Sequence, residues 1–126
     1  MKILLSPGDR HTAGFESERR QTMAGQAPVQ TPKFPLGSVF ITPGAHDRAQ
    51  FLEEDLGAYI KRHHHGDWGE LDPEDRQLND RAVTNGSRIL SSYKLKDGQT
   101  KIWIITDAEV MDGVRISTTI LLPEEY

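Results

Sequence analysis

The residues that could carry chemistry concentrate in one short segment, between His63 and Glu70. Two glycines in this segment, at 66 and 69, surround Asp67 and Trp68, and glycines in such an arrangement are typical of a tight turn. The pattern predicts a corner that presents Trp68 as a binding anchor with one N–H donor. Asp67 would then orient a neighbour, with His63 as the first candidate. The alternative is a structural turn, in which Trp68 fills the core and Asp67 caps backbone amides.

Three consecutive histidines, at positions 63–65, raise the question of a metal site. Successive residues on a helix point about 100° apart, so these three imidazoles cannot hold one ion together. Neither His46 nor a nearby carboxylate stands at a diagnostic spacing from them. We therefore expect no metal and no cofactor. Helical spacing turns His63 inward, where it would be either an acid–base group or a hydrogen-bonded buried histidine.

A second set of polar residues follows along the chain. Asp75 and Asn79 are four residues apart, so their side chains share a helix face and could bind a common neighbour. Arg88 immediately precedes a predicted strand, and Tyr93 lies toward the end of that strand. Together with His63 they would supply an imidazole, a cation and a hydroxyl, which are the groups that metal-independent RNA cleavage needs. The sequence motifs of α/β-hydrolases, P-loop proteins and dinucleotide-binding proteins are absent.

The hydrophobic pattern predicts an α+β fold that would position these residues. We expect two helices packed on a small antiparallel sheet, made of a three-strand C-terminal meander plus an N-terminal strand. Residues 36–126 would form this single domain. Residues 1–35 contain four prolines and few apolar residues, so we expect an extended or disordered segment there. The predicted elements are a strand at 39–42, a helix at 45–63 with an interruption at Gly57, a helix from Pro73 to Asn85 capped by Asp72, strands at 89–95, 102–105 and 116–122, a turn at 96–98 and a polar loop at 107–113.

Composition and charge limit the class of protein. The chain has 126 residues, a formal charge of −4 and no cysteine. This fits one domain with its own core, no disulfide framework and a cytoplasmic location. No run of eighteen apolar residues is present, so we expect no membrane partner. An acidic chain lacks the basic stripe of nucleic-acid-binding proteins, so RNA is an expected partner only under the ribonuclease hypothesis.

Several longer runs carry a resemblance to a known family. They include Phe34-Pro35-Leu36-Gly37, the pair Arg62-His63 before Gly66-Asp67-Trp68-Gly69, Lys101-Ile102-Trp103-Ile104-Ile105-Thr106, and Thr118-Thr119-Ile120-Leu121-Leu122-Pro123-Glu124-Glu125-Tyr126. From Phe34 onward the chain resembles a family of small uncharacterised bacterial proteins described as plasmid-related. The loop at 107–115 is longer than the family's short acidic turn, and the N-terminal segment has no counterpart. The resemblance implies residence on plasmids or other mobile genetic elements and implies no activity.

Three hypotheses of function follow. The leading one is a small accessory protein of mobile elements that binds a host or element-encoded protein, with Asp67, Trp68, Asp75 and Asn79 at the contact; a role against host defence would fit this setting. The second is a metal-independent ribonuclease that uses His63, Arg88 and Tyr93. It draws on a fainter likeness of element order to barnase-type and RelE-type RNases, which by itself implies no activity. The third is a structural or regulatory homodimer.

Overall fold

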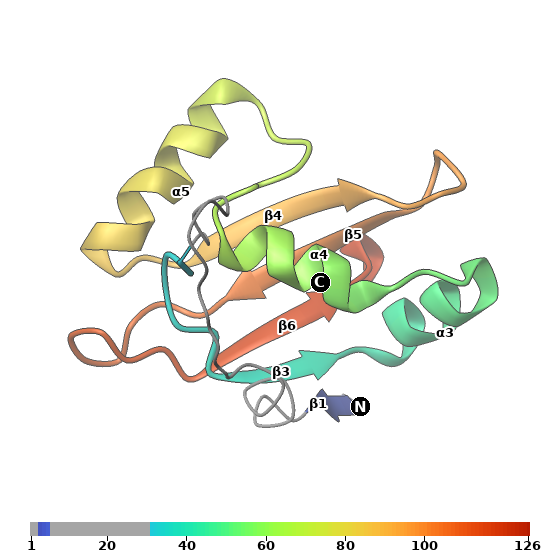
Figure 1. Cartoon of the computed structure of the whole chain (residues 1–126), viewed down its shortest axis with the longest axis horizontal. Coiled ribbons are helices and arrows are strands. Elements are labelled where there is room, and N and C mark those ends of the chain that lie inside the picture. The colour runs from blue at the N-terminus through green and yellow to red at the C-terminus, as the bar shows by residue number, and fades with distance from the viewer. Residues whose placement is uncertain (1–2, 6–30) are drawn as a thin grey trace, which may run out of the picture.

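The chain adopts the expected α+β fold in a computed structural model that describes residues 3–5 and 31–126. The helices are α3 (Pro43–Leu52), α4 (Leu56–His64) and α5 (Pro73–Asn85), and the strands are β1 (Ile3–Leu5), β3 (Ser38–Ile41), β4 (Ile89–Lys94), β5 (Lys101–Thr106) and β6 (Ser117–Leu121). In Figure 1, α4 crosses in front of the sheet, while α3 and α5 lie toward opposite ends of it. A 3-10 turn, η1 (Pro123–Glu125), follows β6.

The sheet is mixed, whereas we expected an antiparallel one. Its strand order is β1-β3-β6-β5-β4. The C-terminal meander β4-β5-β6 is antiparallel throughout, as predicted. However, β3 runs parallel to β6, with Ser38 opposite Ser117 and Ile41 opposite Ile120. A parallel pair needs a long crossover connection, and the three helices together with β4 and β5 provide it.

The helix expected at 45–63 is two helices, and the break precedes Gly57. α3 ends before Glu53, which adopts a left-handed backbone conformation with φ 56°. Asp55 then caps α4 by accepting a hydrogen bond from the N–H of Gly57 at 3.0 Å. The Glu53 carbonyl accepts a hydrogen bond from Nζ of Lys96 at 2.7 Å. Lys96 belongs to the turn after β4, so a contact that is distant in sequence holds the break in place.

The second predicted helix is confirmed at both ends. Asp72 caps α5 by accepting a hydrogen bond from the N–H of Asp75 at 2.8 Å, and Pro73 is the first helical residue. At the other end Gly86 adopts φ 84° and donates its N–H to the Ala82 carbonyl. These are the cap chemistries that the sequence indicates.

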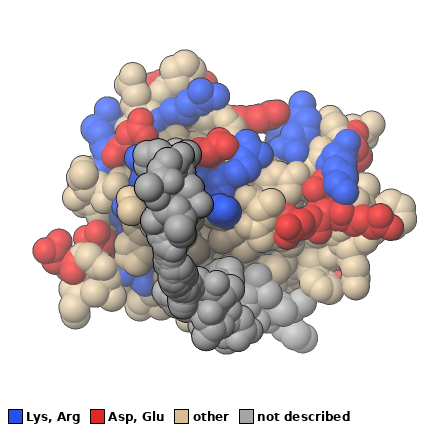
Figure 2. Space-filling view, in the orientation of Figure 1, with Lys and Arg blue, Asp and Glu red and all other residues tan. Residues whose placement is uncertain are grey.

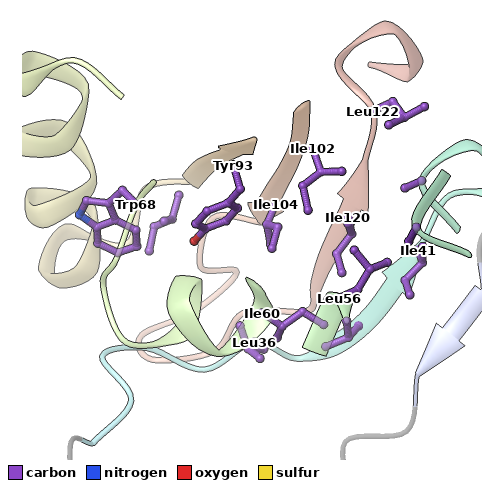
Figure 3. Packing of buried hydrophobic residues seen from close by; sticks show 14 of the residues in the cluster. Leu36, Ile41, Leu56, Ile60, Trp68, Tyr93, Ile102, Ile104, Ile120 and Leu122 are labelled. Carbon is purple, nitrogen blue, oxygen red and sulfur yellow. The ribbon is translucent and has the colours of Figure 1, made fainter. Parts of the chain in front are cut away.

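The main core lies between α4 and the sheet. Figure 3 shows Leu56 and Ile60 of α4 pointing toward Ile104 and Ile120 of the strands. Ile104 and Ile120 are fully buried. Helix α4 is thus held on the sheet by apolar burial, and its orientation decides which of its polar residues face inward.

The chain joins the core slightly earlier than the predicted start of the domain at residue 36. Phe34 is only 5% exposed. Gly37 then enters β3 with φ 66°, and a Cβ on it would lie 2.3 Å from the Ile116 carbonyl oxygen, so glycine is required for this close approach. Residues 6–30 of the predicted N-terminal segment lie outside the described residues.

Candidate functional site

His63 faces the sheet from the last turn of α4 and is completely buried. Its two ring nitrogens each meet a hydroxyl: Nδ1 lies 2.6 Å from Oγ of Ser91 on β4, and Nε2 lies 2.8 Å from Oγ1 of Thr106 on β5. The hydroxyl of Thr106 lies 2.7 Å from that of Thr118 on β6. Thr118 donates to the Leu36 carbonyl at 2.8 Å. We call these four side chains the His63 network.

The tautomer of His63 follows from counting hydrogens in this network. Each hydroxyl has one hydrogen to donate. Thr118 uses its hydrogen on the Leu36 carbonyl, so Thr106 must donate to Thr118. The Nε2 of His63 must therefore carry the proton and donate to Thr106, while Nδ1 accepts from Ser91. Every donor then points in one direction along the chain of bonds, which leaves a neutral imidazole with both nitrogens satisfied.

The surroundings of His63 favour this neutral form. Phe34 meets the imidazole edge-on with ring centroids 5.2 Å apart, and Trp68 does the same at 6.0 Å. Burial lowers the pKa of His63 to about 3, and the positive charges of His64 and Arg115 act in the same direction. A base with such a pKa is unprotonated at neutral pH and shielded from solvent. In this structure His63 has the geometry of a structural hydrogen-bonding group.

The expected grouping of His63, Arg88 and Tyr93 does not form in the described structure. Tyr93 is buried, and its hydroxyl donates to the Asp67 carbonyl at 2.6 Å. Arg88 instead donates from Nη1 to the Tyr126 hydroxyl at 2.6 Å. Tyr126 packs on Trp103. The neighbours of Trp103 along β5 belong to the core cluster, so the Trp103 side chain points to the opposite face of the sheet from His63. The prediction was wrong for Arg88, because strand alternation turns it to the opposite face of the sheet.

Trp68 takes the structural alternative that the sequence left open. Its side chain is 4% exposed, and its ring stacks on Phe34 at a centroid distance of 6.1 Å. The indole N–H donates to Oδ1 of Asp80 on α5 at 2.9 Å. Trp68 therefore joins α5 to the core and is not a surface anchor.

Asp67 orients a neighbour, but the neighbour is Arg62 and not His63. One carboxylate oxygen lies 2.7 Å from Nε of Arg62, and the other accepts from the Gly69 N–H at 3.2 Å. The Arg62 hydrogen bond, followed by the Gly69 N–H, lowers the pKa of Asp67 against the opposing effect of burial. The guanidinium also lies 4.7 Å from the ring centroid of Tyr93. This half-exposed pair is a surface feature that closes the corner.

Asn79 is buried against the edge of the sheet, while Asp75 is not brought to the same neighbour. The Asn79 amide donates to the Leu90 carbonyl at 2.7 Å and accepts from the Leu90 N–H at 3.2 Å. The amide thus pairs with β4 as a neighbouring strand would. Asp75 is exposed, and its carboxylate accepts no hydrogen bond from the described residues. The shared role that the four-residue spacing predicted is therefore absent.

Arg115 is a buried residue that reasoning from the sequence missed. Its side chain has no exposed surface, although it follows a polar loop. Nη1 donates to the carbonyls of Ser87 and Asp107 at 2.8 and 3.0 Å, and Nη2 donates to the Ala82 carbonyl at 2.9 Å. These bonds connect the end of α5 to the segment between β5 and β6. Only the burial of a guanidinium reveals this role, and no sequence pattern marks it.

The segment held by Arg115 is a hairpin with an apolar tip, which we call the 107–116 hairpin. It closes through Val110 N–H to the Val114 carbonyl at 2.9 Å, and a bridge pairs Met111 with Val114. Gly113, at the end of the predicted polar loop, has φ 78°. Glu109 N–H also donates to the Gly86 carbonyl at 2.8 Å. Its exposed apolar side chains are Val110 (58%), Met111 (66%), Val114 (43%) and Ile116 (58%). In Figure 1 the hairpin projects at the end of the sheet opposite α3.

The face of the molecule in Figure 2 carries no large patch of a single charge. Basic and acidic side chains are interspersed over the face in Figure 2. No group of three histidines, aspartates or glutamates suited to a metal ion occurs within residues 3–5 and 31–126. In the same part of the chain, no helix combines the length and apolar character needed to cross a bilayer.

Comparison with known proteins adds no relative. No family model matches the chain, and neither the curated proteins nor the solved structures contain a match. The function must therefore be argued from the surface and the interior of this molecule.

Proposed function

We propose that this protein is a non-enzymatic binding module and that the 107–116 hairpin is its contact surface for a protein partner. The observation that carries the proposal is a concentration of exposed apolar side chains. Of the seven large hydrophobic residues exposed in the described part of the chain, four lie in this hairpin. Isolated exposed hydrophobics are ordinary, whereas several exposed hydrophobics gathered in one short segment are characteristic of interaction sites.

The base of the hairpin supports this interpretation. The Arg115 guanidinium donates three hydrogen bonds to carbonyl groups, and the Asp107 carboxylate accepts one from the Ser117 hydroxyl at 2.8 Å. A buried guanidinium is costly to desolvate, and the Nε of Arg115 has no hydrogen-bond partner among the described residues, so the bonds from Nη1 and Nη2 to three carbonyls are what compensates its burial and ties the hairpin to the end of α5. A loop fixed before it binds loses less conformational entropy on association. An apolar tip on a braced base therefore suits a specific partner.

The biological setting of the proposal comes from the family resemblance. It favours an accessory protein of a plasmid or other mobile element that acts in the cytoplasm on a host or element-encoded protein. A regulatory or anti-defence role fits that setting. The ribonuclease alternative has less support, because its three residues are divided between the two faces of the sheet.

Affinity capture with matched variants tests the proposal. Met111→Asp should abolish recovery of a stoichiometric protein partner that the wild type retains. Phe51→Asp is the control, because Phe51 is also exposed (78%) but lies on α3, at the other end of the sheet. Both variants should unfold at the wild-type temperature. Equal recovery by wild type and Met111→Asp, or recovery of RNA alone, would contradict the proposal.

Trp68→Ala is unsuitable for the same test. Its ring is buried on Phe34, and its N–H is bonded to Asp80. Truncation would remove a buried aromatic side chain, which typically costs about 3–5 kcal/mol of stability. Loss of binding in that variant would report unfolding.

A further inference from the structure

The two edges of the sheet are closed in different ways. The outer edge of β4 is covered by other parts of the same domain: the Asn79 amide pairs with Leu90, and the segment at 68–70 pairs with Ser92. Ser92 N–H donates to the Trp68 carbonyl at 3.1 Å, and Glu70 N–H donates to the Ser92 carbonyl at 2.6 Å. No further strand can add at these positions.

The outer edge of β3 is closed only by β1 among the described residues. β1 is three residues long and antiparallel, with Ile3 opposite Ile41, Leu4 opposite Phe40 and Leu5 opposite Val39. Residues 6–37 separate it in sequence from β3. Figure 1 shows β1 at the margin of the sheet beside β3. An uncovered strand edge offers free N–H and C=O groups to any extended segment.

We propose that the outer edge of β3 is a docking site for an extended strand, and that its occupant in trans is β1 of a second copy of this chain. Among the described residues, the segment seated on this edge is Ile3-Leu4-Leu5. The same segment from another copy makes the same backbone pairs in the same register. Reciprocal exchange closes a two-fold dimer, in which each sheet keeps its strand order.

The protein concentration determines whether β1 pairs with β3 of its own chain or with β3 of a second copy. The contacts are identical in cis and in trans, so the difference is the entropy of closing the connection within one chain. A tethered segment has an effective concentration of up to about the millimolar range. The monomer therefore predominates at micromolar concentration, and exchange becomes significant as the protein approaches millimolar concentration. A three-residue strand also detaches more readily than a long one, because it has few pairs to break.

A peptide-binding experiment on the full-length chain tests the edge itself. The variant Ile3→Gly, Leu4→Gly, Leu5→Gly keeps the chain length and removes the side chains of β1. The probe is a fluorescent peptide of residues 1–7, and a scrambled peptide of the same composition is its control. We expect saturable binding to the glycine variant at least tenfold tighter than to the wild type, where β1 competes in cis. Equal binding of the two proteins, equal binding of the two peptides, or no saturation up to millimolar peptide would overturn the proposal.

A disulfide experiment tests exchange between otherwise unaltered chains. The protein has no cysteine, so Leu4→Cys in one chain and Phe40→Cys in another introduce one thiol each, and strand exchange brings these two thiols to opposed positions, which raises the yield of the heterodimer above that of random collision. Directly opposed residues in paired strands have Cα separations that suit a disulfide. Mixed at millimolar concentration under mild oxidation, the pair should give at least fivefold more heterodimer than Leu4→Cys mixed with Gln99→Cys, which lies in an exposed turn. Equal yields of the two heterodimers would refute strand exchange.

Discussion

The buried His63 predicts that the fold loses stability in mild acid. In the folded chain the pKa of His63 is lowered to about 3, first by burial and then by the charges of His64 and Arg115. In the unfolded chain it returns to about 6.5. Unfolding therefore takes up a proton at any pH between these values. The stabilising effect of a neutral His63 is complete above pH 6.5 and is lost as the pH falls toward 3.

The size of the effect follows from the width of that window. One pH unit within it corresponds to about 1.4 kcal/mol for one proton. Because His63 is only half protonated in the unfolded chain at pH 6.5, the free energy of unfolding should fall by about 2 kcal/mol between pH 6.5 and pH 4.5, and by about 5 kcal/mol in total once the pH is below 3. Domains of this size have total stabilities of about 5–15 kcal/mol. One histidine therefore accounts for a large share of the acid sensitivity.

Urea unfolding measured at several pH values gives the slope. The wild type should take up one more proton on unfolding than His63→Gln does over pH 6–4.5. His46→Gln is the matched control, because His46 is a half-exposed histidine on α3 outside the His63 network, and this variant, which keeps His63, should retain the proton uptake that His63→Gln loses. Protonation of carboxylates affects all three proteins alike and cancels in the comparison.

Two results would refute the reasoning. Parallel pH profiles for the wild type and His63→Gln would show that His63 does not stay neutral in the fold. Nitrogen-15 NMR of the wild type provides the second test and does not depend on a variant. It should show the Nε2–H tautomer of His63 at neutral pH and down to about pH 4, since Thr106 and Thr118 leave no other proton arrangement. An Nδ1–H signal would show that the hydrogen bonds of the His63 network run in the opposite direction.

Three further substitutions test other parts of the structure. Asn79→Asp replaces the donor that faces the Leu90 carbonyl with a second acceptor, and should lower the free energy of unfolding in urea by about 1–3 kcal/mol. Arg115→Met removes three hydrogen bonds to carbonyl groups. The amides of the 107–116 hairpin should therefore exchange at least tenfold faster in hydrogen-exchange mass spectrometry. Unchanged exchange rates would show that Arg115 does not stabilise the hairpin. Gly69→Ala places a Cβ 2.0 Å from a β4 carbonyl oxygen and should strongly lower the melting temperature. Gly98→Ala is the control, because Gly98 also has a positive φ but a Cβ there meets no atom within 4 Å. Equal decreases in melting temperature would show that the close approach at Gly69 does not matter.

Local signals predicted the elements of this fold well. The cap residues of α5 lie within a few positions of the helix ends, and the turn at 96–98 lies between strands of alternating or continuous apolar character. Such features depend on neighbours in sequence and can be read from it. The inward orientation of His63 followed for the same reason, because helical spacing fixes which face a residue shares with Ile60.

Features that depend on distant contacts could not be predicted in this way. The break between α3 and α4 is held by Lys96, which is 43 positions from Glu53. The parallel pairing of β3 with β6 depends on where the crossover returns, and strand composition carries no information about direction. Both errors were about arrangement. The strand at Ile3–Leu5 was not predicted either, because residues 1–35 were expected to lie outside the domain and β1 is defined by its pairing with β3.

The candidate site shows the same division at the level of single residues. Trp68 and Asn79 were singled out because their types suit recognition, and in the fold both recognise parts of their own chain. A hydrogen-bonding group can serve the interior or a partner, and only burial distinguishes the two uses. Arg115 shows the converse: its position after a polar loop indicates a solvated charge, yet it is buried and braces the most apolar exposed segment described. The segment that Arg115 holds in place, the 107–116 hairpin, is therefore the first place to test for function.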